Sequence, residues 1–214
     1  MIGDTRFKVC GLTRAEDARL ATELGADFLG FILYPKSPRY LGLGDAAELA
    51  RGAPRGPKRV AVLVEPTLEE LDWAQEAGFD RFQIHARADL PLAVVRGWSE
   101  AVGARELWLA PKLPPGVAFP MDWLPLAATF LVDTYHAEGF GGSGKTGDWS
   151  GFAALAVAHP EKTWVLAGGL SPENVAEARR QSGACFVDLN SGVESAPGVK
   201  DEAKLRALAA ALAG

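Results

Sequence analysis

The chain has 214 residues, a hydrophobic content of 48% and a formal net charge of −5. This length supports one hydrophobic core, so we expect a single domain over residues 1–214. Acidic and basic residues are interspersed, and without a basic patch we expect neither nucleic acid nor an anionic membrane as a partner. The apolar runs are too short to cross a bilayer and the first residues lack a signal-peptide core, so we expect a cytoplasmic protein.

The chain has two cysteines, Cys10 and Cys185, and neither belongs to a C-x-x-C pair. Two cysteines are too few for a disulfide framework. Cys185 lies within the largely apolar run ACFVDL, where we expect a small buried side chain.

Eight short β-rich runs, each followed by a turn signal, alternate along the chain with amphipathic stretches. We predict strands over residues 7–10, 28–33, 59–64, 81–85, 106–110, 129–133, 163–167 and 184–190. The clearest helices are predicted over residues 14–24, 67–77, 172–181 and 201–212.

Local signals mark where these helices begin and end. Thr67 and Glu70 have the spacing of a capping box, and Gly25, Gly78 and Gly183 have the positions of C-terminal caps. The proline-rich residues 111–125 predict an irregular fifth connection rather than a domain boundary.

Eight consecutive βα units favour a closed (β/α)₈ TIM barrel, an α/β fold, over a doubly wound open sheet. Its active site is then expected at the carboxyl ends of the strands. Alternate strand residues face the lumen and the helices. The lumenal side chains are expected to be Lys8, Cys10, Gln83 and His85, while Asp133 and Asp188 lie near the ends of strands six and eight. The side chains that pack beneath the helices are expected to be Phe7, Val9, Phe82, Ile84, Val132 and Val187.

A glycine-rich segment follows strand six. Residues 139–146 satisfy the G-x-x-x-x-G-K-[ST] pattern of nucleotide-binding P-loops. A P-loop leaves its strand directly and opens a helix, whereas here several residues separate the strand from Gly139, and Gly147 follows Thr146 at once. We therefore interpret the segment as an anion-binding loop beside Asp133, which indicates an enzyme for small phosphorylated substrates.

Seven segments in this order, KVCGLT, SPRY, QIH, LVDT, GGSGKTGDW, AGGL and VDLNSGVES, span nearly the whole chain. Together they resemble the phosphoribosylanthranilate isomerase family of tryptophan biosynthesis. The resemblance implies an intramolecular oxidoreductase that converts N-(5'-phosphoribosyl)anthranilate to 1-(o-carboxyphenylamino)-1-deoxyribulose 5-phosphate by an Amadori rearrangement. It also implies that no cofactor or metal is used, and that the protein is a monomer or a homodimer.

The resemblance further implies roles for individual residues. Cys10 corresponds to the family's general base, Asp133 to its general acid, and Arg39 to the residue that holds the anthranilate carboxylate. The phosphate is expected on three loops, which here contain Gly142, Ser143 and Gly144, then Gly168 and Gly169, and finally Ser191 and Gly192.

The chemistry requires these residue types. Asp133 has to protonate the ribose ring oxygen, and Cys10 has to remove the C2′ proton that the resulting iminium acidifies. These roles require a raised pKa for Asp133 and a lowered pKa for Cys10.

Other polar residues could have either a structural or a substrate-binding role. An unpaired lumenal ammonium is costly, so Lys8 is expected to pair with Asp188 as a structural element. Asp188 is also expected among the substrate-binding residues. Gln83 and His85 are expected either to orient the substrate or to form a polar layer. Three positions depart from the family pattern: Gly147, Asn190 and Ala86. These departures leave open how the glycine-rich loop packs and whether one contact to the phosphate is made.

Two alternative functions remain at this point. A metal-dependent ribulose-phosphate 3-epimerase would use His85, Asp133 and Asp188 as ligands, but it offers no role for Arg39 or Cys10. A non-catalytic barrel that binds a phosphorylated ligand is the second alternative, and the presence of both Cys10 and Asp133 speaks against it.

Overall fold

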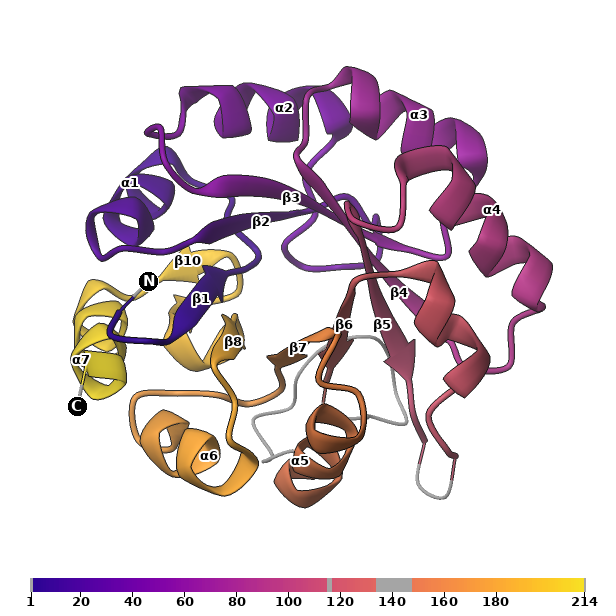
Figure 1. Cartoon of the computed structure of the whole chain (residues 1–214). Coiled ribbons are helices and arrows are strands. Elements are labelled where there is room, and N and C mark those ends of the chain that lie inside the picture. The colour runs from indigo at the N-terminus through magenta and orange to yellow at the C-terminus, as the bar shows by residue number, and fades with distance from the viewer. Residues whose placement is uncertain (1, 115–116, 134–147, 214) are drawn as a thin grey trace.

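A computed structural model describes residues 2–114, 117–133 and 148–213. Its eight parallel strands form a closed barrel in which each strand pairs with its neighbour in sequence and β1 closes the ring on β8 (Figure 1). The strands are β1 Arg6–Val9, β2 Phe28–Ile32, β3 Lys58–Val64, β4 Arg81–Arg87, β5 Leu107–Lys112, β6 Thr129–Val132, β7 Thr163–Leu166 and β8 Phe186–Leu189. The predicted barrel is confirmed.

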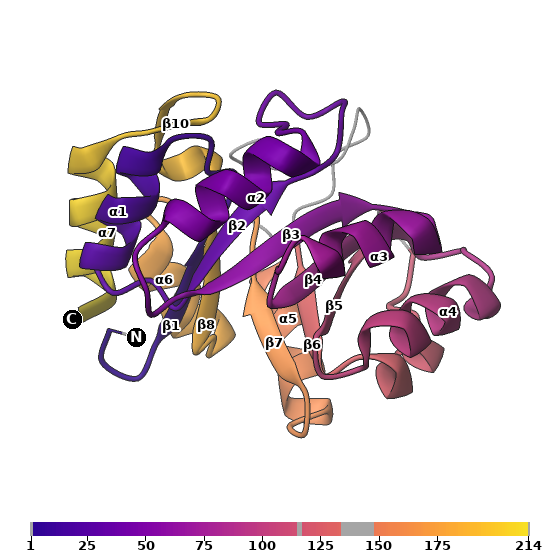
Figure 2. The same ribbon diagram turned by 90° about the horizontal axis from the view of Figure 1, so that it is seen from above.

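Helices form an outer ring around the strands (Figures 1 and 2). They are α1 Ala15–Glu23, α2 Leu43–Gly52, α3 Leu68–Glu76, α4 Leu92–Val102, α5 Trp149–Ala158, α6 Val175–Ser182 and α7 Glu202–Ala213. Between β5 and β6 the chain forms the 3₁₀ helix η1, Met121–Leu126, as expected for an irregular fifth connection. In the ranges that the structure describes, no helix is both long and apolar enough to span a bilayer.

The predicted caps explain where the helices begin and end. Thr67 precedes α3, its side chain accepts a hydrogen bond from the Glu70 backbone N–H, and Glu70 bonds back to the Thr67 N–H. This capping box satisfies donors that the first helical turn leaves unpaired. Gly183 ends α6 in the left-handed conformation, which glycine adopts without steric cost.

Two apolar cores lie on the two sides of the barrel wall. Phe7, Val9, Phe82, Ile84 and Val187 are buried between the strands and the helices, and Val132 is half-buried there, as the alternation predicts. A second cluster fills the lumen. Near the amino ends of the strands its floor is aromatic, because Trp108 contacts Phe28 and Phe186 edge to face, with ring centroids 4.8 and 5.5 Å away.

Two features around β8 differ from expectation. Cys185 is exposed, and the prediction that it is buried is wrong. The strand begins only at Phe186, so Cys185 lies before the barrel wall at its amino-terminal edge. After β8 and the short 3₁₀ helix η2, Ser191–Val193, the chain forms an unpredicted antiparallel hairpin of β9, Glu194–Ala196, and β10, Val199–Lys200.

Candidate functional site

A cavity opens at the carboxyl ends of the barrel strands, with a volume of about 780 Å³ including its open mouth. The structure brings together around it every predicted site residue that it describes: Cys10, Arg39, Gln83, His85, Asp133, Gly168, Gly169, Asp188, Ser191 and Gly192. The predicted phosphate ligands Gly142, Ser143 and Gly144, and the atypical Gly147, lie outside the described residues.

Cys10 directly follows β1 and is buried at the base of this cavity. Its side chain and that of Lys8 lie over Gly30 of β2. A Cβ at position 30 would stand 2.8 Å from Lys8 Cε and 3.0 Å from Cys10 Sγ, closer than packed atoms approach. The missing side chain of Gly30 therefore makes room for a cation beside the thiol.

Lys8 pairs with Asp188 across the β1–β8 seam, with Nζ 2.9 Å from Oδ1. The predicted ion pair is confirmed. Burial lowers the pKa of Lys8, but the charges of Asp188 and Cys10 outweigh it and raise that pKa. Lys8 is therefore a fixed positive charge beneath the cavity.

The pKa of the Cys10 thiol is raised, not lowered as its role led us to expect. Burial is the main cause because it disfavours the thiolate, and the nearby positive charge of Lys8 opposes it. The structure thus places the cation needed to stabilise a thiolate beside Cys10, in surroundings that keep the thiol mostly protonated.

Gln83 and His85, both on β4, line the cavity one lumenal step apart. Their Nε2 atoms are 2.8 Å apart, so the amide of Gln83 donates to an unprotonated His85 Nε2. Burial and the charge of Lys8 lower the pKa of His85 to about 4, which makes its ring neutral at physiological pH. Gln83 Oε1 is buried and has no hydrogen-bond partner among the described residues.

Arg39 lies in the segment after β2 and reaches the cavity from the side. Its guanidinium is paired with Glu194 of β9, with Nε 2.9 Å from Oε1 and Nη2 2.6 Å from Oε2. Its side chain is 15% exposed. Asp133 directly follows β6 and faces the same cavity from another part of the barrel.

The connections after β7 and β8 pack against each other at the rim. Gly168 and Gly169 have φ values of +91° and +65°, a region that side chains other than glycine rarely adopt. A Cβ on Gly192 would overlap the backbone carbonyl of Leu170. Glycine at these positions therefore lets two backbones come together at one side of the cavity.

Similarity to known proteins decides which family uses this arrangement. The family model of N-(5'-phosphoribosyl)anthranilate isomerase matches residues 7–211. The chain belongs to this family. It is 37% identical to the isomerase of Synechococcus elongatus over 97% of this chain and 96% of the relative, and 38% identical to that of Cereibacter sphaeroides over 94% and 95%.

Solved structures of this isomerase family have the same fold. The enzyme from Thermus thermophilus superposes with a TM-score of 0.80 at 36% identity and 98% coverage of both chains. A second family structure, determined with reduced 1-(o-carboxyphenylamino)-1-deoxyribulose 5-phosphate, has a TM-score of 0.74 at 31% identity, covering 97% of this chain and 98% of its own. Membership of the isomerase family decides against the metal-dependent epimerase alternative.

Two isomerase residues near the site were missed by the sequence reasoning. Glu194, which holds Arg39, lies inside the VDLNSGVES segment but carries no signal of its own. Asn174 accepts a hydrogen bond from the Ser171 backbone N–H at 2.9 Å and donates to the Gly169 carbonyl at 2.8 Å. Both residues act on the site through other residues, which is why a search for reactive side chains passes over them.

Proposed function

We propose that this chain isomerises N-(5'-phosphoribosyl)anthranilate to 1-(o-carboxyphenylamino)-1-deoxyribulose 5-phosphate in tryptophan biosynthesis, with Asp133 as general acid and Cys10 as general base. The family membership supports the reaction. The observation that carries the residue assignment is that Cys10, after β1, and Asp133, after β6, line one cavity beside the Lys8 charge.

Each step of the proposed reaction moves a proton. Asp133 donates its proton to the ribose ring oxygen, the C1′–O bond breaks, and the anilino nitrogen supplies the electrons that form an iminium at C1′. Cys10 as thiolate then removes the proton from C2′, and the C–H electrons neutralise the iminium to give an enolamine. Protonation of the enolamine at C1′ and loss of the enol proton give the ketone, so neither a metal ion nor a redox cofactor is needed to balance the reaction.

Binding is assigned to residues that surround these two groups. Arg39 offers a guanidinium to the anthranilate carboxylate, and such charge-assisted pairs are stronger than neutral hydrogen bonds. Gln83 Oε1 is buried without a partner among the described residues, which supports a hydrogen bond to a sugar hydroxyl. Gly168, Gly169, Ser191 and Gly192 line the rim where the phosphate is proposed to bind. We also propose that the enzyme acts on this small phosphorylated substrate in the cytoplasm.

The reaction is tested by adding the purified chain to freshly prepared phosphoribosylanthranilate and following the loss of the substrate's anthranilate-type fluorescence. Turnover is expected, with the same rate after exhaustive treatment with EDTA, because the C1′ iminium serves as the electron sink. Absence of turnover with a folded protein would contradict the proposed activity. Loss of turnover with EDTA that Zn²⁺ or Mn²⁺ restores would contradict the mechanism.

A further inference from the structure

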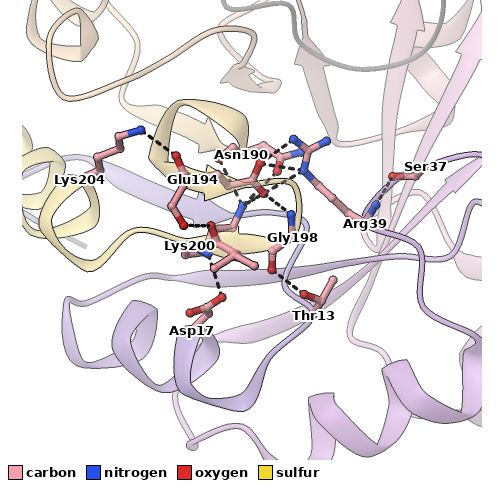
Figure 3. A network of polar contacts seen from close by, with 11 residues as sticks. Thr13, Asp17, Ser37, Arg39, Asn190, Glu194, Gly198, Lys200 and Lys204 are labelled. Atoms are coloured by element: carbon pink, nitrogen blue, oxygen red, sulfur yellow. Dashed lines mark hydrogen bonds and ion pairs between the residues drawn. The ribbon is translucent and has the colours of Figure 1, made fainter.

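The β9–β10 hairpin places a buried carboxylate between two cations at one side of the cavity (Figure 3). Lys200 of β10 is the cross-strand partner of Glu194 of β9. Lys200 Nζ lies 2.8 Å from Glu194 Oε1, and Arg39 Nη2 lies 2.6 Å from Glu194 Oε2. Glu194 therefore joins Lys200, on the hairpin, to Arg39, on the connection after β2.

The carboxylate is held on several sides. The Glu194 side chain is 4% exposed, and besides the two cations it accepts a hydrogen bond from the Gly198 backbone N–H at 3.2 Å. Burial tends to raise the pKa of Glu194, but the hydrogen bond from Arg39 and the charge of Lys200 outweigh it and lower that pKa. Glu194 is therefore an anion with a fixed orientation.

The hairpin itself is tied to the barrel. Asp17 of α1 accepts from the Lys200 backbone N–H at 3.0 Å, and Thr13 donates its hydroxyl to the Gly198 carbonyl. Lys204 of α7 donates to the Glu194 carbonyl at 2.7 Å. Figure 3 shows these contacts on different sides of the hairpin. They leave Glu194 little freedom to follow Arg39 if the arginine moves.

One further contact holds the arginine from the barrel side, and a second ties Asn190 to Lys200. Gly11, with φ +71°, directly follows Cys10, and a Cβ there would stand 2.6 Å from Arg39 Cδ and 2.7 Å from Asn190 Oδ1. The side chain of Arg39 thus lies directly on the backbone next to Cys10. Asn190 Oδ1 in turn accepts from Lys200 Nζ at 3.1 Å, which gives this departure from the family pattern a place in the same network.

A guanidinium has five N–H donors, one on Nε and two on each of Nη1 and Nη2, so one edge combines Nε with Nη2 and the other combines Nη1 with Nη2. Glu194 engages Nε and Nη2, so the edge that carries Nη1 is turned away from Glu194. Arg39 lines the cavity, and the Nη1 edge is the one that Glu194 leaves available for a ligand there. Burial lowers the pKa of Lys200, and the carboxylate of Glu194 opposes this effect. In its protonated form Lys200 gives the cluster one net positive charge, whereas an Arg39–Glu194 pair alone is neutral.

We propose that Glu194, held by Lys200, is a positioning residue that selects the guanidinium edge which Arg39 presents to the cavity, and so makes the site selective for a substrate with an aromatic carboxylate. The inference rests on the proposed function, because it takes Arg39 as the ligand of the anthranilate carboxylate. It deepens that function by assigning the selectivity to a hairpin outside the cavity wall.

The test compares the binding of two analogues to Glu194→Ala, Glu194→Gln and wild-type protein. One is reduced 1-(o-carboxyphenylamino)-1-deoxyribulose 5-phosphate, and the other is the same molecule without its carboxyl group. Glu194→Ala is expected to weaken the carboxylated analogue at least about tenfold and the other less than about twofold, as for loss of an oriented charge-assisted contact. In turnover, KM should rise by a similar factor while kcat changes less than about threefold.

A double-mutant cycle shows whether Glu194 acts through the arginine. In an Arg39→Ala background, Glu194→Ala is expected to cause no further loss of affinity for the carboxylated analogue, because the effects of substitutions at interacting residues are not additive.

Asp80→Asn is the matched control. Asp80 holds Lys58 Nζ at 3.1 Å and the Arg59 backbone N–H at 2.8 Å at the opposite end of the barrel, so its loss should leave analogue selectivity unchanged.

Two results would overturn the inference and leave Glu194 a structural residue. One is that Glu194→Ala weakens the binding of both analogues equally. The other is that Glu194→Ala weakens binding of the carboxylated analogue as much in the Arg39→Ala background as in the wild-type background. If Glu194→Ala does not fold, the binding of the same two analogues to the isosteric variant Glu194→Gln decides. Failure of the wild-type protein to prefer the carboxylated analogue would instead contradict the proposed function. Wild-type preference that survives both substitutions contradicts the inference alone.

Discussion

The thiol of Cys10 lies where two opposing effects meet. Burial disfavours its charged form, while Lys8 stands beside it as a positive charge that the Asp188 pair keeps in place. Gly30 is required for this arrangement, because any side chain there would displace one of the two groups. A thiolate formed in such surroundings is poorly solvated and strongly basic, which suits removal of a proton from carbon.

Replacement of Cys10 by serine tests its role as the base. Cys10→Ser keeps a similar size, but the hydroxyl is too weak an acid to provide an anionic base, so we expect kcat to fall at least about a hundredfold. Binding of the reduced product analogue should stay near the wild-type level. Exchange of the C2′ hydrogen with solvent, followed as washout of deuterium from substrate labelled at C2′, should be abolished. Exchange at the wild-type rate would show that another group is the base.

The raised pKa of Cys10 predicts how the reactivity of its thiol depends on pH. Turnover also requires the protonated form of Asp133, whose population falls as the pH rises, so the thiolate has to be followed on its own. The rate at which iodoacetamide alkylates Cys10, measured on the Cys10 peptide by mass spectrometry, should rise by up to about tenfold per pH unit between pH 6 and 8. The charges that face Cys10 come from Lys8, Asp188, Arg39 and Lys200. Of these, Asp188 disfavours the thiolate, and Lys8 and Lys200 favour it.

His85 provides the internal control for this pH profile. Its pKa is lowered to about 4 by burial and by Lys8, so it is already neutral at pH 6 and adds no inflection above that value. An alkylation rate of Cys10 that is flat from pH 6 to 8 would show that the thiol is already ionised there and would contradict its raised pKa.

At the scale of single elements, one side chain organises the connection after β7. Asn174 directly precedes α6, and its amide bridges the Ser171 N–H and the Gly169 carbonyl. This connection packs on Gly192, so the amide stabilises both backbone segments to which phosphate binding is assigned.

Asn174→Ala should loosen this rim and weaken phosphate binding without touching the proton-transfer groups. We expect KM to rise about three- to tenfold, the scale of about 1 kcal/mol for one or two lost hydrogen bonds, with kcat nearly unchanged. Inorganic phosphate should inhibit the variant more weakly by a similar factor. Glu177→Gln, at a half-exposed position on the same helix, is the control, and an equal effect from it would point to α6 as a whole.

Sequence reasoning works best where the cause is local. The capping box at Thr67, the alternation that buries Phe7 and Val9 while Lys8 faces the lumen, and the glycine at the end of α6 all follow from residues within one or two turns. The β9–β10 hairpin was not predicted, because its few ladder pairs are stabilised by distant groups such as Asp17 and Thr13. For the same reason the Arg39–Glu194 pair, 155 residues apart in sequence, had no signal.

Over the whole molecule, the lumen divides into a polar end and an apolar floor. Cys10, Asp188 and His85 lie toward the carboxyl ends of the strands, and the aromatic group of Phe28, Trp108 and Phe186 lies toward the amino ends. Arg6 closes this floor, with its guanidinium carbon 4.7 Å from the centre of the Phe186 ring. This division indicates that the aromatic floor stabilises the barrel, while the catalytic and binding residues lie at the other end of the lumen.

Trp108→Ala tests this division. Trp108 is 2% exposed and does not line the cavity, so its truncation should leave a void in the floor and lower the free energy of unfolding by about 3–5 kcal/mol. Urea unfolding measures the change, and Val157→Ala, at a position that is 81% exposed, should leave it within about 0.5 kcal/mol. At temperatures where the variant stays folded, kcat/KM should remain within about threefold of wild type, because the floor stabilises the barrel without contacting substrate. A variant with wild-type stability but greatly reduced turnover would show that the aromatic floor takes part in the reaction, and the separation between the two ends of the lumen would be wrong.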